Sequence, residues 1–255
     1  MSGDENLPDV SAYPVEIDPA ELKPKTERHH RNVQRGSARA AVFGASDGLV
    51  SNVSLILGVA GANSSQAVVR IAGLAGLIAG ALSMAAGEWV SMQAQKELFE
   101  RELELERREH QRNPNVEKVE LAQIYQSRGL DPGTAFQLAD QVMQDPDQAL
   151  EIHAREELGF APDELGNPVE AAGTSLAAFA VGAALPLLPW FFTGGASAVI
   201  ASIVLGVIGA ASVGVMLAWA TGRPMVLAVV RQVGIAAVAA ALTFGIGSLV
   251  GADVG

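Results

Sequence analysis

The sequence contains no cysteine and few aromatic residues, and each absence narrows the possible functions. Without cysteine, the 255-residue chain has no disulfides, thiolate metal ligands or redox dithiol. Aromatic residues make up only 5% of the chain, against 27 glycines, a composition typical of closely packed membrane helices. Basic residues are also scarce, because 17 Lys and Arg stand against 28 Asp and Glu, for a net charge of −11. This balance argues against a nucleic-acid partner.

The chain is rich in long apolar runs. Five of them are long enough to cross a hydrocarbon core of roughly 30 Å, namely 40–62, 68–95, 171–192, 197–220 and 225–250. The second continues without a helix breaker into acidic sequence, so we expect one long helix that leaves the membrane near 88–92. We therefore predict an all-α membrane protein with five transmembrane helices. Because five spans make a thin bundle, we expect a homodimer with an ion path near its two-fold axis.

An acidic stretch separates the second and third apolar runs, and we expect it to be a water-soluble insert of three to four helices. Asp-Pro pairs indicate N-caps with proline in the first helical turn, at 131–132 and 145–146. The expected organisation is a disordered cytoplasmic arm (1–38), two transmembrane helices (39–95), an acidic metal-binding domain (96–168) and three transmembrane helices (169–255). Residues 161–168 are expected to form a link.

The distribution of Lys and Arg predicts the orientation of the chain. With the N-terminus in the cytoplasm, all of the 17 Lys and Arg except Arg70 lie inside or at the inner boundary. The positive-inside rule therefore favours a cytoplasmic N-terminus and insert and an external C-terminus, in a multi-pass cell (inner) membrane protein. Residues 1–9 are polar and acidic, so no cleavable signal peptide is expected.

Asp47 is the one charged residue of the first apolar run. A carboxylate within a spanning helix costs about 2.5–3.5 kcal/mol on insertion scales, and it usually faces a partner or a water-filled path. At 1.5 Å per residue, Asp47 lies roughly 10 Å inside the cytoplasmic boundary. Ser51 and Ser54 follow on the same helix face, so we expect all three residues to line a path. The alternative is that Asp47 caps a helix that begins just inside the interface.

Met84 reaches a similar depth on the second apolar run, which crosses in the opposite direction. Glu88 and Met92 follow it at i+4 and i+8 and are further candidates to line the path. Carboxylate favours harder ions and thioether softer ones, so an Asp47–Met84 site suits a borderline ion such as Fe²⁺ or Mn²⁺. A methionine in an apolar helix usually serves only to fill space in the packing. Met84 is a candidate metal ligand only because it lies at the same depth as Asp47.

Three pairs of acidic or imidazole side chains in the insert each share one helix face. They are Glu106 with Glu109, Glu117 with Glu120, and His153 with Glu157. If the three pairs face one another, they can bind Fe²⁺, Mn²⁺, Co²⁺ or Zn²⁺. The same spacing also fits a solvated helix with Glu/Arg pairs such as Glu97–Arg101 and Glu104–Arg108.

These segments together resemble the vacuolar iron transporter family of Fe²⁺/Mn²⁺ transporters, in a bacterial form. The resemblance is carried by SDGLVSNVSLILGVAGA (46–62), AGALSMAAGEWVSMQAQ (79–95) and EIHAREELG (151–159), and by the five-span layout with its insert. It covers about residues 38–250, and the first two motifs are specific. It implies a dimeric five-helix membrane fold, proton-coupled export of Fe²⁺ or Mn²⁺ from the cytoplasm, and a cytoplasmic metal-binding helical domain.

The resemblance also implies roles for individual residues. Asp47 and Met84 match the family's path through the membrane, and five glutamates match its cytoplasmic metal site, namely Glu106, Glu109, Glu117, Glu120 and Glu157. The chain departs from the family pattern at His153, where a methionine is expected four residues before Glu157. Imidazole still ligates Fe²⁺, Mn²⁺ and Zn²⁺ but titrates near pH 6.5, so this departure bears on metal preference and pH response.

The function expected from the sequence is export of Fe²⁺ and/or Mn²⁺ from the cytoplasm by proton antiport, with Zn²⁺ and Co²⁺ as further candidate ions. No enzymatic activity or prosthetic group is expected. The alternative is a membrane-anchored metal sensor or store without ion flux. A membrane iron enzyme is disfavoured, because such sites pair Glu-x-x-His motifs on two helices and the insert has no second copy.

Overall fold

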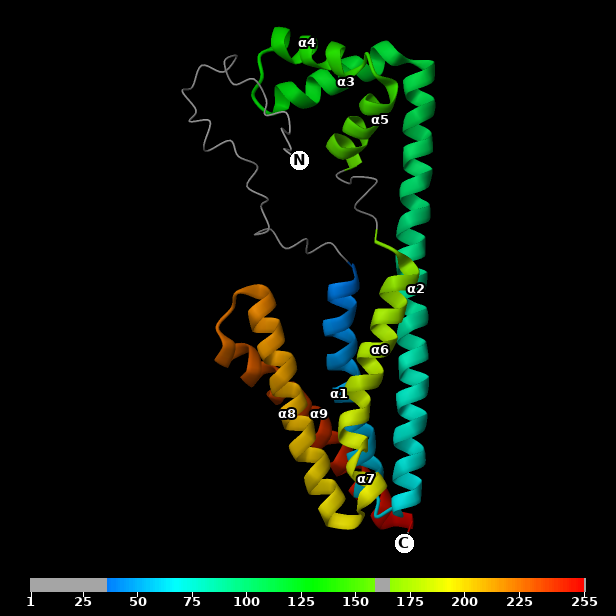
Figure 1. Ribbon diagram of the computed structural model, residues 1–255, viewed down its shortest axis with the longest axis vertical. Coiled ribbons are helices and arrows are strands. Elements are labelled where there is room, and N and C mark those ends of the chain that lie inside the picture. The colour runs from blue at the N-terminus through cyan, green and yellow to red at the C-terminus, as the bar shows by residue number, and fades with distance from the viewer. Residues whose placement is uncertain (1–35, 159–165, 255) are drawn as a thin grey trace, which may run out of the picture. The chain divides into compact units, whose positions relative to one another are not determined.

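The computed structural model describes the backbone of residues 36–158 and 166–254, which are helical apart from short turns and contain no strand (Figure 1). The elements in order are α1 (Gly36–Gly61), α2 (Gln66–Arg112), α3 (Pro114–Ser127), α4 (Pro132–Val142), α5 (Pro146–His153), the π-helical turn η2 (Ala154–Leu158), α6 (Pro168–Leu187), α7 (Pro189–Phe192), α8 (Gly195–Thr221) and α9 (Met225–Val254). The expected arm falls outside the described residues except for its last three, which are helical because α1 begins at Gly36. The expected link falls outside them up to residue 165.

Five of these helices are long and apolar enough to cross a membrane, as the sequence predicts: α1, α2, α6, α8 and α9. Large apolar side chains remain exposed along them, including Ile71, Ile200 and Val226. A soluble protein rarely exposes so many such side chains, whereas lipid tails solvate them without cost.

Helix α1 lies among the other candidate spans and packs against α2, α6, α8 and α9. Its contact with α6 is the most extensive. A Cβ atom on Gly48 would overlap the carbonyl group of Phe179, and a Cβ atom on Gly182 would overlap the carbonyl group of Ala45. The absence of side chains at these two glycines therefore lets the backbones of α1 and α6 touch, which fixes the position of the helix that carries Asp47.

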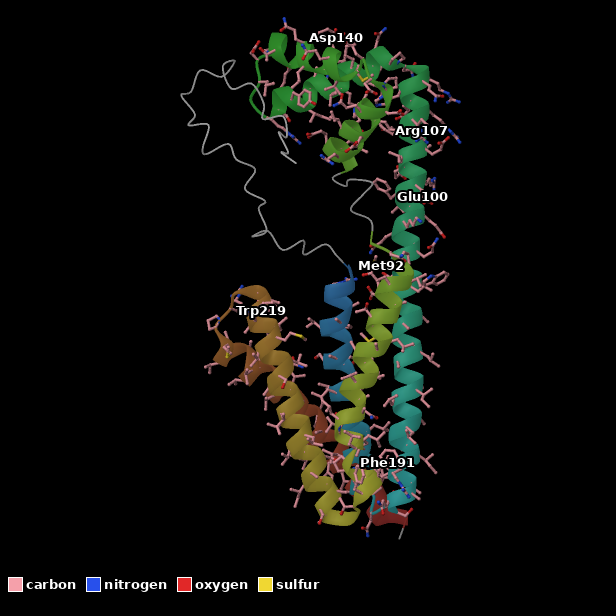
Figure 2. The ribbon with its side chains drawn as sticks, viewed as in Figure 1. Met92, Glu100, Arg107, Asp140, Phe191 and Trp219 are labelled. Carbon is pink, nitrogen blue, oxygen red and sulfur yellow. The ribbon has the colours of Figure 1, made fainter. Side chains whose placement is uncertain are left out.

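Helix α2 is a single helix of 47 residues, as the absence of breakers predicts. Ser65 caps its start, and its side chain accepts a hydrogen bond from the backbone N–H of Val68. Met92, Glu100 and Arg107 lie along the same uninterrupted helix in Figure 2. The apolar first half of α2 and its charged second half are therefore mechanically continuous.

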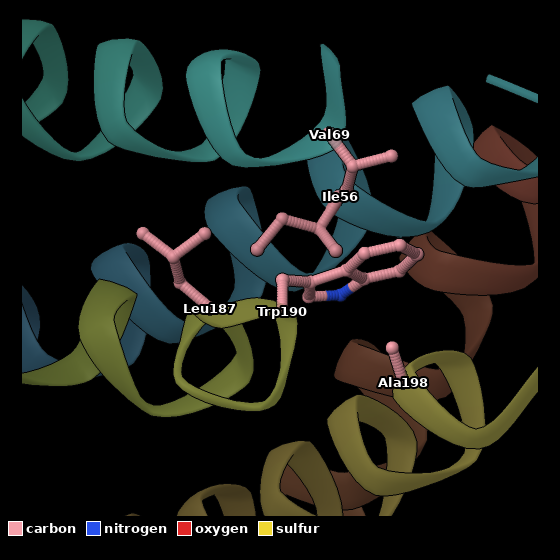
Figure 3. Close-up of a cluster of buried hydrophobic side chains, with 5 residues drawn as sticks. All are labelled: Ile56, Val69, Leu187, Trp190 and Ala198. Carbon is pink, nitrogen blue, oxygen red and sulfur yellow. The ribbon is translucent and has the colours of Figure 1, made fainter. Parts of the chain in front are cut away.

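Pro186 lies one residue before the end of α6, and Pro189 is the first residue of α7. The resulting turn packs Trp190 against Ile56, Val69, Leu187 and Ala198 in a buried cluster (Figure 3). The indole N–H of Trp190 donates to Ser202, which in turn donates to the carbonyl of Pro186. This chain of hydrogen bonds satisfies polar groups that the proline-bearing end of α6 leaves without helical partners.

Helices α3, α4 and α5 pack around a small apolar core that includes Leu121, Ala139 and Ala149. Both Asp-Pro predictions are confirmed. The carboxylate of Asp131 accepts from the N–H groups of the first turn of α4, and that of Asp145 does the same for α5. These caps set where each helix begins. Helix α5 ends at His153, where the π-helical turn follows.

Candidate metal centre

Four potential metal ligands from three helices converge in the insert. Glu106 and His110 lie one turn apart on α2, Glu117 lies in the first turn of α3, and His153 is the last residue of α5. The chain turns between α2 and α3 at Asn113, whose backbone N–H closes the last turn of α2 by donating to the carbonyl of Glu109. This tight connection brings the end of α2 and the start of α3 together.

The ligand atoms of these four side chains all lie within 4.8 Å of one another. Nε2 of His110 lies 2.8 Å from Nδ1 of His153 and 3.2 Å from Oε1 of Glu106. Nδ1 of His153 lies 3.4 Å from the same Glu106 oxygen and 3.8 Å from Oε2 of Glu117. A metal ion about 2.1 Å from each ligand sets neighbouring ligands roughly 3.0–3.4 Å apart, so the observed spacing fits one ion.

The four residues are nearly closed to solvent, with exposed fractions of 6% for Glu106, 4% for Glu117 and 0% for His153, and 9% for the side chain of His110. Oε1 of Glu106 and Nε2 of His153 have no hydrogen-bond partner among the described residues. Within the same residues, the ion pairs found for Glu106 and Glu117 are with histidines alone. Two buried carboxylates without a Lys or Arg partner call for a cation to compensate their charge.

The titration behaviour of the cluster follows from its crowding. Burial, together with the nearby charge of Glu106, raises the pKa of Glu117 to about 7. Glu106 behaves in the opposite way, because the imidazole of His110 beside it lowers its pKa. Burial lowers the pKa of His153, which keeps its imidazole neutral and free to ligate a metal.

The remaining predicted acids surround this cluster without joining it. Glu109, Glu120 and Glu157 are exposed. The pKa of Glu157 is raised, mainly by burial and then by the charges of Glu106, Glu120 and Glu109. The three acids are therefore close enough to the cluster to interact with it electrostatically. The structure therefore brings together Glu106, Glu117 and His153 and leaves the other three at the rim.

His110 is a member of the cluster that sequence reasoning missed. The available signal was its position four residues after Glu106, which places both on one face of α2. The predicted solvated pair Glu104–Arg108 is present at 2.9 Å. Glu97 instead accepts a hydrogen bond from Gln93 at 2.8 Å. One helix therefore carries both a solvated charged face and a buried ligand face.

A second group of predicted residues lies among the candidate spans. Asp47 and Ser51 of α1 and Met84 of α2 line one cavity of about 300 Å³, together with Asn52 and Phe179 among others. Asp47 lies in the middle of α1, so the alternative that it caps the start of a helix is wrong. The cavity thus combines a carboxylate, a hydroxyl and a thioether in an otherwise apolar region.

The other three predicted path residues lie elsewhere. Ser54 is buried, with a hydroxyl group that has no partner among the described residues, and it does not line this cavity. Glu88 accepts a hydrogen bond from Arg39 at 3.1 Å, which joins α1 to α2. Met92 is buried in the continuous part of α2. On both α1 and α2, therefore, helical spacing alone places residues on the face of the cavity that do not line it.

Comparison with known proteins adds a family to this geometry. The model of the VIT family matches residues 38–248. A vacuolar iron transporter of Acanthamoeba castellanii is 40% identical over 221 residues, which cover 84% of this chain and 78% of that protein. Vacuolar iron transporter 2 of Oryza sativa subsp. japonica is 31% identical over 90% of this chain and 93% of its own length. The family match includes both the cavity and the four-residue cluster.

Proposed function

This chain belongs to the VIT family, and on that premise we propose that it is a membrane transporter that exports Fe²⁺ from the cytoplasm. The observation that carries the proposal is the cavity among the candidate spans, where Asp47 and Met84 converge. A carboxylate and a thioether together suit a borderline divalent ion. The similar proteins bear the name of iron transporters, which supports a transporter rather than an enzyme.

We assign Mn²⁺ as a second cargo and proton antiport as the driving mechanism. Protonation of Asp47 from the outer side neutralises the carboxylate and releases the ion, and loss of that proton to the cytoplasm resets the site. Asp47 is exposed in the single chain, which supports a homodimer in which the partner's copy of α1 completes the path.

The four-residue cluster has a separate role in this proposal. We assign it, with Glu109, Glu120 and Glu157 at its rim, to a cytoplasmic metal-binding domain (96–168) that collects ions for the path. The positive-inside distribution supports the placement of this domain and of the N-terminal arm (1–38) in the cytoplasm, with two spans before the domain and three after it. The same distribution supports an external C-terminus. We assign the protein to the cell (inner) membrane.

Uptake of Fe²⁺ or Mn²⁺ into proteoliposomes under an imposed pH gradient tests the proposal. We expect uptake by the unmodified chain and its loss in Asp47→Ala. Asp140→Asn is the matched control, because Asp140 is an exposed carboxylate that pairs with Lys118 outside the candidate spans. Uptake at the unmodified rate in Asp47→Ala would remove the assigned role of Asp47.

A membrane-anchored sensor or store is the second candidate, and the cluster favours it because the cluster can bind an ion without any path. The same vesicles discriminate the two functions. Metal binding without accumulation inside the vesicles at any pH gradient identifies a sensor or store, whereas accumulation identifies a transporter.

A further inference from the structure

Asn52 lines the same cavity as Asp47 and Met84, and its side chain is in an unusual state. It is 98% buried, with an exposed fraction of 2%. Its Nδ2 group donates a hydrogen bond of 2.6 Å to the carbonyl oxygen of Ala183 on α6. Its Oδ1 atom has no hydrogen-bond partner among the described residues.

The orientation of this amide follows from its partner. The carbonyl of Ala183 accepts hydrogen bonds and cannot donate them, so the NH₂ group of Asn52 must face α6. The carbonyl oxygen is thereby held on the opposite side. A Cβ atom on Gly76, another residue that lines the cavity, would lie 3.0 Å from Oδ1, so this oxygen points toward the α2 wall.

A buried acceptor without a donor is costly, and this cost suggests a ligand. An asparagine carbonyl oxygen is a regular ligand of hard and borderline divalent ions. Asn52 follows Asp47 by five residues, so it lies roughly 7.5 Å farther along the axis of α1, deeper in the candidate span.

We propose that Oδ1 of Asn52 is a further ligand of the transported ion, engaged after Asp47 as the ion moves deeper between α1 and α2. This inference rests on the proposed function. The neutral oxygen replaces part of the ion's hydration shell without adding a second charge that would hold the ion in place. The hydrogen bond to Ala183 keeps the oxygen in position, facing Gly76.

The test is Fe²⁺ uptake into proteoliposomes by Asn52→Leu, with Mn²⁺ and Zn²⁺ as competing ions. Leucine keeps the branched shape of the side chain but is larger, and it removes the carbonyl oxygen together with the NH₂ group. We expect the KM for Fe²⁺ to rise at least tenfold. Inhibition by Mn²⁺ should weaken at least threefold more than inhibition by Zn²⁺, because the harder ion depends more on oxygen ligands and the softer one keeps the Met84 thioether.

Two further variants separate ligation from packing. Gln66→Leu is the matched control, since Gln66 donates to the carbonyls of Trp190 and Thr193 and does not line the cavity. It should leave KM and the Mn²⁺/Zn²⁺ inhibition ratio unchanged. Gly76→Ala adds a methyl group 3.0 Å from Oδ1, and Leu55 must shift because its Cδ2 would overlap the same methyl group. This variant should change the ratio as Asn52→Leu does.

Several results would overturn the inference. If Asn52→Leu lowers only the rate and leaves KM within twofold and the inhibition ratio unchanged, Asn52 is a packing residue. If Asn52→Leu does not fold, an unchanged inhibition ratio in Gly76→Ala refutes the inference on its own. If the unmodified chain shows no uptake, the proposed function and the inference are both overturned. If the unmodified chain takes up Fe²⁺ and Asn52→Leu has the same KM and inhibition ratio, the inference alone is overturned.

Discussion

Substitution of Glu106 by Gln is the sharpest test of the four-residue cluster. Glu106 supplies the oxygen that lies 3.2 Å from the His110 nitrogen and 3.4 Å from the His153 nitrogen. Its matched control is Glu104→Gln, on the same helix and two residues away. Glu104 pairs with Arg107 and Arg108 on the solvated face.

The expected magnitude follows from the position of Glu106 among the ligands. Groups that only orient a metal ligand change metal affinity by about 10–100-fold when they are removed. Glu106 is itself a candidate ligand and carries the charge that compensates the ion, so its loss should weaken binding at least 100-fold. This corresponds to about 2.8 kcal/mol of binding free energy. Glu104→Gln should change the affinity by less than about twofold, because exposed ion pairs contribute little.

Isothermal titration of the full chain in detergent with Mn²⁺ or anaerobic Fe²⁺ measures the effect. An Asp47→Ala background removes binding at the transmembrane cavity from the signal. A second measurement needs no metal. Burial is the main cause of the raised pKa of Glu117, and the charge of Glu106 adds to it. Carboxyl ¹³C NMR should therefore find that pKa lowered in Glu106→Gln and unchanged in Glu104→Gln.

Two results would refute the reasoning. Equal affinities in Glu106→Gln and Glu104→Gln would exclude Glu106 as a ligand. An unshifted pKa of Glu117 in Glu106→Gln would show that the two carboxyl groups are not close neighbours, and the cluster itself would then be wrong.

Four further predictions follow from the structure. Because the pKa of Glu117 is raised to about 7, this group must lose a proton to bind metal, so affinity measured by titration should rise up to about tenfold per pH unit below pH 7 and level off above it; a flat profile from pH 6 to 8 contradicts this. For the same reason the metal-free chain should lose stability as the pH rises from about 4.5 to 7, since the fold favours the protonated form. Gly182→Ala should destabilise the detergent-solubilised protein by about 1–3 kcal/mol in thermal unfolding, whereas Gly173→Ala on the same helix, with open space around it, should not. Asp145→Ala removes the N-cap of α5 and should cost about 1 kcal/mol, visible as faster amide hydrogen exchange in α5; unchanged exchange would show that the cap is dispensable.

The sequence by itself determined the features that depend on local chemistry. The five candidate spans follow from the length of the apolar runs, and the starts of α4 and α5 follow from the Asp-Pro pairs. The unbroken helix α2 follows from the absence of proline or a glycine stop near 88–95. Asp47 is conspicuous in sequence because a single carboxylate in an apolar run is costly wherever the rest of the chain lies.

Only the tertiary structure decided which polar side chains meet. Glu106 and His110 share a buried face of α2, while Glu109, at a different angle on the same helix, is exposed. The contact between His110 and His153 joins residues 43 positions apart, and it exists because α3, α4 and α5 pack around their own small core. In the sequence, Asn52 is an ordinary polar residue. Only in the structure does its NH₂ group donate to a carbonyl of α6 and leave its oxygen without a hydrogen-bond partner among the described residues. Helical periodicity gives the angle of a side chain around its own axis, but the neighbour at that angle is set by the packing of the whole bundle.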